Sequence, residues 1–329
     1  MKNRFLRRVP VQVLLAGCVV LLMSFGAKAV EMGTWTDIAS FENGDTKNQL
    51  RWVVEDGVIP DGLMFGPTAF LTAADGKLYI ADVLNFRLLV CSENGKPVGE
   101  IDLKRIKKTA ALEHDPLVID LVLREPGKLY LADAGNNRVL VVTSTGDFLR
   151  TVGKTGTGPG EFRQINKIHT DETGKVYVED LSMARTIAFT PRGTFVTAYQ
   201  GLTSVAVDTF GNIHQIVFDG DVKSRNVMIY DENGVPVELL ATILSDEDIK
   251  YVKPVGFDAG SSFYVTYDTD RYRYYVAFNT QGAISRNIRT APLDEGIQVT
   301  TPDWVAPDGT IYTIQAFPDK FTIKKLVTP

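Results

Sequence analysis

Six short units of similar sequence follow one another along this chain, and they limit its fold more than any other feature. Each unit has a turn glycine, followed within four residues by an aromatic or histidine side chain in a strand-like run. Successive glycines are 51, 47, 37, 49 and 49 residues apart. A repeat of this length predicts the blades of a propeller, since no single unit can bury both of its faces. The glycines are Gly76, Gly127, Gly174, Gly211, Gly260 and Gly309.

Two further landmarks divide each unit into four strands. An aspartate closes the second strand, as in Ala81-Asp82 and Ala132-Asp133, and an arginine opens the third, as in Arg87 and Arg138. A second turn glycine follows the first by 19 residues in the first three units, and by 23 and 22 in the next two. Aspartate suits such a turn because its carboxylate accepts from nearby backbone amides. The fold class predicted is therefore all-β, a six-bladed β-propeller of four-stranded antiparallel blades.

The two chain ends are expected to close the ring. The last unit has three strands, ending in residues 321–326, and residues 49–54 align with the fourth strand of other units. We therefore expect an N-terminal strand, residues 49–54, to complete the last blade, which removes a sheet edge. This divides the chain into a lead-in over 30–48 and a propeller over 49–329. Residues 34–41 read as a further strand without an assignable partner, and a seventh, partial blade is the alternative.

The first 29 residues have the pattern of an export signal. A basic segment, an apolar run from Val9 to Phe25 and Ala27-Lys28-Ala29 occur in the order of a cleavable signal peptide. The protein is therefore expected to be exported, to the periplasm or beyond the cell. Leu15-Ala16-Gly17-Cys18 resembles a lipobox, so lipidation of Cys18 and an uncleaved anchor are the alternatives to cleavage after Ala29.

Composition narrows the range of partners. Hydrophobic residues make up 44% of the chain and charged residues 23%, which is ordinary for a globular protein. The leader holds five of the 35 basic residues and no acid, so the mature chain would carry 30 − 40 = −10. This charge argues against nucleic acid as a partner. Only Cys91 would remain, in mid-strand, where a packed thiol is expected.

Two insertions between units are predicted to be short surface helices. Residues 103–112 are basic and weakly amphipathic. Ser245 followed by Asp246, Glu247 and Asp248 has the pattern of a helix start, which Pro254 would end.

The repeats resemble the NHL family. The resemblance rests on Gly-Lys-Thr-Gly-Thr-Gly-Pro-Gly-Glu-Phe over 153–162 and on Ala-Asp-Ala-Gly-Asn-Asn-Arg-Val over 132–139. It is strong over residues 60–200 and weaker over 200–329. It implies a six-bladed propeller, and it implies a binding platform for proteins, RNA or glycans more often than an enzyme.

Metal-dependent catalysis is the sharpest alternative. Propeller enzymes such as the peptide-amidating lyase and gluconolactonase-like lactonases hold a metal in the axial channel. The chain has three histidines, His114, His169 and His214, which fall at different depths of the repeat. We do not expect them to converge on one zinc ion, since all ligands must lie near 2 Å from it.

Polar residues near the starts of the inner strands are the candidate ligand-binding residues at the channel mouth. Aspartate and asparagine oxygens there could hold a hard cation such as calcium, whereas the two lysines at the same height favour a rim of ion pairs. No cofactor is predicted, with a calcium or zinc ion in the channel as the alternative. The six residues are Asp120, Asn166, Lys167, Ser204, Lys253 and Asp303.

A run of alternating arginine and tyrosine forms the second candidate site. Arg271, Tyr272, Arg273 and Tyr274 follow a predicted blade turn. Such side chains combine flat apolar area with hydrogen-bond donors and could stack on a sugar or peptide. Cross-strand pairing on an exposed face is the simpler explanation.

Together these features predict an exported, non-catalytic binding or scaffold propeller, which recognises a protein, peptide or glycan on one face. The alternative is a metal-dependent lyase or lactonase acting at the axial channel. We expect a monomer that meets a membrane only through an N-terminal lipid or an uncleaved anchor.

Overall fold

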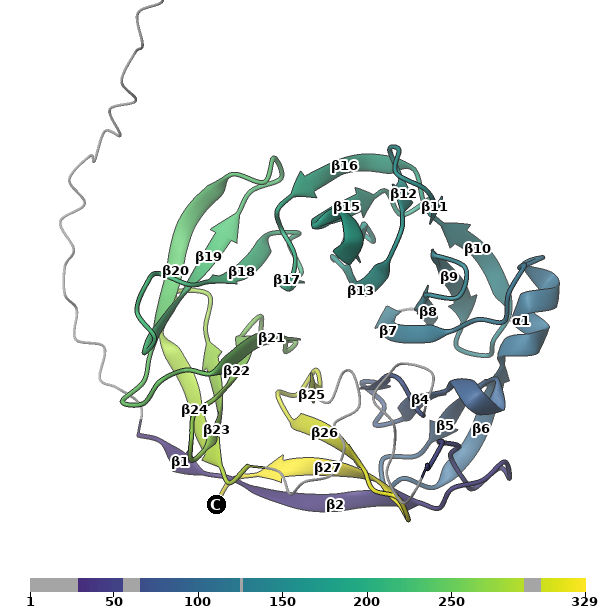
Figure 1. The fold of residues 1–329 in the computed structure, drawn as a ribbon, viewed down its shortest axis with the longest axis horizontal. Coiled ribbons are helices and arrows are strands. Elements are labelled where there is room, and N and C mark those ends of the chain that lie inside the picture. The colour runs from purple at the N-terminus through teal and green to yellow at the C-terminus, as the bar shows by residue number, and fades with distance from the viewer. Residues whose placement is uncertain (1–28, 56–65, 125–126, 293–302) are drawn as a thin grey trace, which may run out of the picture.

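The computed structural model describes residues 29–55, 66–124, 127–292 and 303–329. Six four-stranded antiparallel sheets stand around a central axis, as Figure 1 shows. We number these blades in chain order. Blade 1 consists of β3 (Phe70–Thr72), β4 (Leu78–Asp82), β5 (Arg87–Cys91) and β6 (Pro97–Asp102). Blade 2 consists of β7 (Val118–Arg124), β8 (Lys128–Asp133), β9 (Arg138–Thr143) and β10 (Phe148–Val152). Blade 3 consists of β13 (Ile165–Thr170), β14 (Val176–Asp180), β15 (Arg185–Phe189) and β16 (Phe195–Gln200).

Blades 4 to 6 repeat the arrangement and include the closing strand. Blade 4 consists of β17 (Val205–Val207), β18 (Ile213–Val217), β19 (Ser224–Tyr230) and β20 (Pro236–Leu244). Blade 5 consists of β21 (Tyr251–Phe257), β22 (Phe263–Asp268), β23 (Arg273–Phe278) and β24 (Ile284–Thr290). Blade 6 consists of β25 (Asp303–Val305), β26 (Ile311–Ala316), β27 (Phe321–Val327) and the closing strand β2 (Thr34–Phe41). The short strand β1 (Glu31–Met32) pairs in parallel with β24, and β11 (Lys154–Thr155) pairs with β12 (Glu161–Phe162). The predicted six-bladed, four-stranded fold is confirmed.

The hydrophobic core lies between neighbouring blades. One cluster joins Tyr130 and Val141 of blade 2 to Val178 and Ile187 of blade 3, and all four side chains are buried. Burial on both faces explains why the middle strands β9 and β15 are nearly continuous apolar runs. Each blade is therefore stabilised by its two neighbours.

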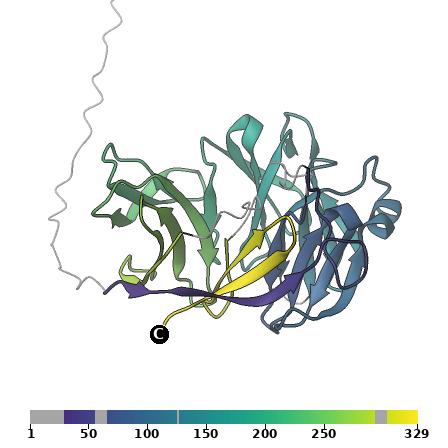
Figure 2. The ribbon, with the colours of Figure 1, turned by 60° about the horizontal axis from the view of Figure 1, so that its bottom comes forward.

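An N-terminal strand closes the ring, as predicted, but the prediction that residues 49–54 form this strand was wrong. Strand β2, residues 34–41, pairs with β27 in blade 6, and Figure 2 shows it lying along that strand. Leu50 and Trp52 instead turn inward and are buried beside blades 1 and 6. The backbone N–H of Arg51 donates to Asp82, as those of Arg163 and Gln164 donate to Asp180 in blade 3. Residues 49–52 thus lead into blade 1, and the lead-in expected over 30–48 contains the closing strand.

One of the two predicted helices is present. Helix α1 (Leu103–Thr109) begins at Asp102, whose carboxylate accepts from the N–H groups of Lys104 and Arg105. The prediction of a helix that begins at Ser245 was wrong. Residues 245–250 form a turn and extended chain. The N–H groups of Ser245 and Ile249 donate to Lys223 and Val222, which holds this segment along blade 4.

Pro254 does not end a helix but lies within the inner strand β21. The register of β21 against β22 shifts between Pro254 and Gly256. An inner strand has a neighbour on one side only, so a residue without an N–H is tolerated there. Two single-turn 3₁₀ helices, η1 (Val83–Asn85) and η2 (Leu181–Met183), form the corresponding turns of blades 1 and 3.

Candidate functional site

The aspartate and arginine landmarks meet at one end of the propeller. Where the second strand of a blade turns into the third, Arg87 pairs with Asp82 at 2.9 Å, and Arg273 pairs with Asp268 at 2.7 Å. Both residues of the first pair are buried. We call this end the Asp-turn face and the opposite end, with the turn glycines, the Gly-turn face. In blades 1, 3 and 5 the landmarks are therefore structural groups that hold the turn between the second and third strands.

Four of the six predicted channel residues lie in inner strands and are linked by charge. They come from blades 2, 3, 5 and 6, which surround the axis (Figure 1). Lys253 Nζ lies 3.3 Å from Asp303 Oδ2. The charge of Lys167 acts on both Asp120 and Lys253, and it favours the ionised carboxylate of the first and the neutral amine of the second. The four residues are Asp120, Lys167, Lys253 and Asp303.

The Lys253–Asp303 pair lies in a polar niche between blades 5 and 6. Only 1% of the Asp303 side chain is exposed, and Tyr275 donates to its Oδ1 at 3.0 Å. Thr266 lies opposite both Lys253 and Tyr275 in the sheet register, so the three side chains share one face of blade 5. Within the described part of the chain, Arg273 Nη1 and the buried hydroxyl of Thr266 have no hydrogen-bond partner. The niche thus has donors available for a ligand or for ordered water.

Burial shifts the pKa values of one acidic and one basic side chain at the channel, Asp120 and Lys253. It raises the pKa of Asp120 to about 6, although the charge of Lys167 and the N–H of Ile168 act in the opposite direction. Burial lowers the pKa of Lys253, and the nearby Asp303 partly offsets that shift. Both groups are therefore closer to neutrality at pH 7 than free side chains would be.

The other two predicted channel residues are not part of this cluster. Asn166 donates to Glu179 Oε2 at 3.0 Å, and Glu179 Oε1 accepts from the N–H of Val205 at 2.8 Å. This contact ties blade 3 to blade 4. Ser204 is exposed, with a left-handed backbone at φ +52°. Sequence reasoning missed Glu179, although it replaces the small Ala81 and Ala132 of other blades.

The three histidines lie in three different segments of the fold. His114 lies in the loop before β7 with its imidazole exposed. His169 is in β13, where burial lowers its pKa to about 3. His214 packs on Phe257 and Phe263, with ring centroids at 5.0 and 5.3 Å. Among the residues that the structure describes, no group of three or more His, Cys, Asp or Glu could hold a metal ion.

The arginine–tyrosine run is only partly a surface patch. Arg273 was expected at the surface but is 8% exposed, because it forms the Asp-turn pair of blade 5. Arg271 is exposed and pairs with Glu247 at 2.6 Å. Tyr272 lies under Arg289, and Tyr274 stacks on Tyr267 with ring centroids 4.7 Å apart. The exposed Arg271 and the half-buried Tyr272 belong to the same Asp-turn face as the channel cluster.

Cys91 is a packed thiol in β5, as predicted. It is fully buried, and burial raises its pKa to about 12. Cys18 and nearly all of the predicted signal peptide lie outside the described residues. No helix among the described residues is long and apolar enough to span a membrane.

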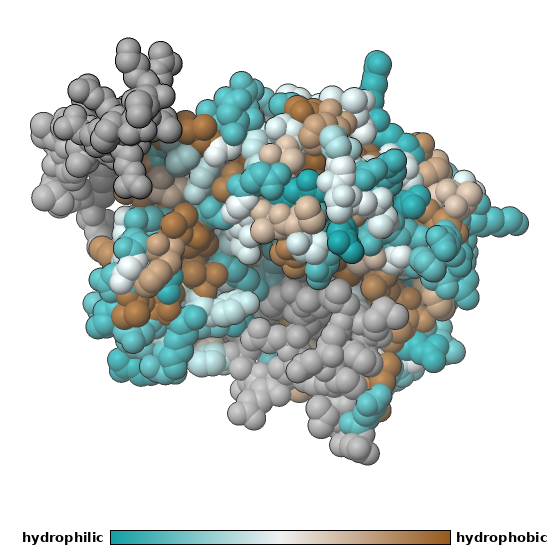
Figure 3. All heavy atoms as spheres, turned by 45° about the horizontal axis from the view of Figure 1, so that its top comes forward, coloured by the Kyte–Doolittle hydropathy of each residue, from teal (hydrophilic) through white to brown (hydrophobic). Residues whose placement is uncertain are grey.

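Blade 4 carries several exposed apolar side chains, at both of its ends and along β20, that the sequence reasoning missed. Figure 3 shows brown side chains grouped on the left, the side on which Figure 1 places blades 4 and 5. Such groupings on a soluble protein often mark contact surfaces. The signal lay in β20, where apolar residues do not alternate regularly with polar ones. The exposed side chains are Phe210, Phe218, Val222, Val235, Val237, Leu239 and Leu244.

Comparisons with known proteins agree with the fold. The model of family DUF5128, described as a six-bladed β-propeller, matches residues 116–201, which contain blades 2 and 3. No curated protein matches the chain.

Solved structures resemble the chain over most of its length. Virginiamycin B lyase from Staphylococcus aureus is 13% identical, with a TM-score of 0.50, and the match covers 90% of this chain and 100% of that one. A protein of unknown function from Bacteroides thetaiotaomicron is 14% identical, with a TM-score of 0.53 and coverages of 90% and 76%. A candidate exported protein from Bacteroides fragilis is 11% identical, with a TM-score of 0.50 and coverages of 91% and 96%. At such identities the likeness concerns the fold alone, and the chain is a six-bladed β-propeller.

Proposed function

We propose that this protein is an exported, non-catalytic propeller that binds a protein, peptide or glycan partner on its Asp-turn face. The observation that carries the proposal is the channel cluster, in which Lys253 pairs with Asp303 and the charge of Lys167 acts on both Asp120 and Lys253. Arg271 and Tyr272 extend the same face outward. Cations at a half-buried mouth favour a partner that offers a carboxylate or another acceptor group.

The resemblance of the repeats to the NHL family supports a binding role. Its members serve mainly as platforms, and near the channel Arg273 Nη1 and the Thr266 hydroxyl have no hydrogen-bond partner among the described residues. The alternative, a metal-dependent lyase or lactonase, is favoured by no ligand set among the described residues. The likeness to virginiamycin B lyase adds only the fold to that alternative.

Export is part of the proposal. It is supported by the basic, apolar and Ala-x-Ala segments of residues 1–29 and by the likeness to a candidate exported protein. Whether the mature chain is cleaved after Ala29 or lipidated at Cys18 is decided by its intact mass.

The test is partner retention by the exported protein. Immobilised wild-type protein is exposed to arrays of acidic and neutral peptides and glycans, beside the variant Lys167→Gln. Lys128→Gln, with the same loss of charge on the Gly-turn face, is the matched control. We expect ligands with acidic groups to be retained, and Lys167→Gln to weaken that retention at least tenfold without affecting the control. Equal retention by all three proteins would contradict the Asp-turn face as the binding face.

A further inference from the structure

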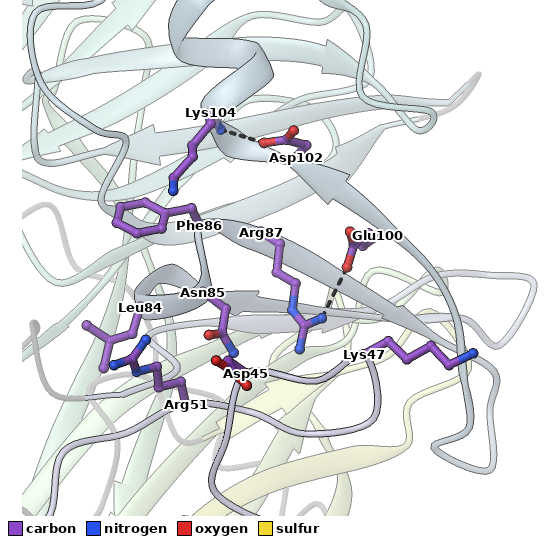
Figure 4. A pocket seen from close by; sticks show the side chains of 10 residues that line it. All are labelled: Asp45, Lys47, Arg51, Leu84, Asn85, Phe86, Arg87, Glu100, Asp102 and Lys104. Carbon is purple, nitrogen blue, oxygen red and sulfur yellow. Dashed lines mark hydrogen bonds and ion pairs between the residues drawn. The ribbon is translucent and has the colours of Figure 1, made fainter.

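A pocket separate from the channel lies at the rim of blade 1. Its volume is about 510 Å³, which suits a small ligand. Four segments form its walls: the loop after β2, the turn η1 with Phe86, the end of β6 and the start of α1. Figure 4 shows the side chains of these segments around the hollow.

Hydrogen bonds within the protein hold the walls of the pocket in place before any ligand binds. Asn85 donates to the carbonyl of Gly44 at 2.9 Å, and Arg87 Nη2 donates to that of Thr46 at 2.9 Å. The N–H of Arg51 donates to the buried Asp82 at 3.1 Å. A preformed site of this kind loses little ordering entropy on binding.

The side chains that line the pocket carry four positive and three negative charges: Lys47, Arg51, Arg87 and Lys104 against Asp45, Glu100 and Asp102. Arg87 is neutralised by Asp82 and Glu100, at 2.9 and 3.1 Å. Within the described ranges, neither Arg51 nor Lys104 has a carboxylate partner, and both are exposed. In Figure 4 Phe86 lies between Lys104 and Arg51, and the Arg51 guanidinium overlaps Leu84 in this view. The Lys104 ammonium lies 4.3 Å from the centre of the Phe86 ring.

We propose that this pocket binds a carboxylated sugar, the chemistry of a uronic acid. The planar guanidinium of Arg51 matches a carboxylate in two parallel hydrogen bonds, and Lys104 adds a second cation. Leu84 and the part of Phe86 that Lys104 does not cover offer an apolar wall for the C–H face of a sugar ring. Asp45, also without a cation partner in the described part of the chain, and Glu100 accept from sugar hydroxyls. This site does not depend on the partner proposed for the channel mouth.

The test is ligand-observed NMR and calorimetry on the full mature protein with D-glucuronate, D-glucose and succinate. We expect glucuronate to bind and glucose to bind at least tenfold more weakly. Succinate, which has carboxylates but no ring, should also be weaker, because it cannot use the apolar wall. Arg51→Gln and Lys104→Gln should each weaken glucuronate binding about tenfold, the factor that corresponds to 1.4 kcal/mol.

Two controls separate this site from the rest of the protein. Lys96→Gln removes a charge from the Gly-turn face of the same blade and should leave glucuronate binding unchanged. Lys167→Gln should also leave it unchanged, so the pocket and the channel proposals fail separately. Absence of glucuronate binding, equal binding of glucose, or unaltered binding by both Arg51→Gln and Lys104→Gln would overturn the proposal.

Discussion

Lys253 of blade 5 and Asp303 of blade 6 form an ion pair across the last blade boundary before the ring closes, with 3.3 Å between Nζ and Oδ2. Tyr275 of blade 5 donates to the same carboxylate. These two contacts attach the final blade, whose outer strand comes from the other end of the chain, to its neighbour.

Substitution of this carboxylate is expected to destabilise the protein. Asp303→Asn keeps an acceptor for Tyr275 but leaves Lys253, 28% exposed, without its counter-charge. We expect the free energy of unfolding at pH 7 to fall by about 2 kcal/mol, less than for a fully buried pair. Chemical denaturation measures the change, with Asp319→Asn at an exposed turn of the same blade as the control. Equal stabilities would show that the pair does not hold the blades together.

Asp120 should make the protein less stable as the pH rises. Because its pKa is raised to about 6 in the folded state, the folded protein binds its proton more tightly than the unfolded chain does. Its contribution is therefore complete below about pH 4, the ordinary range of a carboxyl, and is lost as the pH rises through about 6. Asp120→Asn should remove about 1 to 3 kcal/mol of this pH dependence. Unfolding at pH 4, 5, 6 and 7 measures it, and parallel curves for the two proteins would contradict the assignment.

Arg87 is expected to tolerate lysine poorly. Its guanidinium contacts Asp82, Glu100 and the carbonyl of Thr46 together, which a single ammonium cannot reproduce. We expect Arg87→Lys to lower the free energy of unfolding by about 2 to 4 kcal/mol and to speed amide exchange over residues 44–50. The control is Arg138→Lys at the same position of blade 2, where, among the described residues, the arginine side chain donates to the carbonyl of Asn136 and to no carboxylate. Similar losses in the free energy of unfolding at both positions would show that the additional contacts of Arg87 do not stabilise the protein.

The stability of the closed ring should require strand β2 but not strand β1. A chain that begins at Gly33 keeps β2, whereas one that begins at Glu42 leaves the edge of β27 unpaired and uncovers Leu326 and Tyr275. We expect the first chain to unfold in one cooperative transition, and the second to lose that transition and to aggregate. Calorimetry and size-exclusion chromatography report both. A cooperative, monomeric second chain would show that the ring is stable without its closing strand.

Divalent metals are expected to leave thermal stability unchanged. A metal held only by the folded protein at 100 times its Kd would stabilise it by about 2.7 kcal/mol. For a domain of this size that would raise Tm by roughly 5 °C or more. Unfolding with EDTA, calcium and zinc in turn measures the effect. A rise with one metal, reversed by EDTA, would favour the lyase or lactonase alternative.

The repeat landmarks were predictable because they depend on local chemistry. A turn that needs a left-handed residue takes a glycine, as at Gly76 and Gly309, and an aspartate at a tight turn accepts from the amides beside it. These requirements recur in most blades, so they appear as spacing in the sequence. Two blades depart from them, since the left-handed residue of blade 5 is Ser261, one position after Gly260, and blade 6 has Gln315 where blades 1 to 3 have the aspartate. The blade count, the strand order within each blade and the position of α1 follow from them.

The tertiary structure decided which parts of different blades meet. Residues 34–41 and 49–54 both have the pattern of a strand, and only the path from the outer edge of blade 6 to the inside of blade 1 assigns β2 to the closing position. The buried position of Arg273, the pairing of Lys253 with Asp303 and the walls of the Arg51 pocket likewise join segments far apart in the chain. Local patterns specify turns and strands, whereas contacts between blades exist only once the ring is closed.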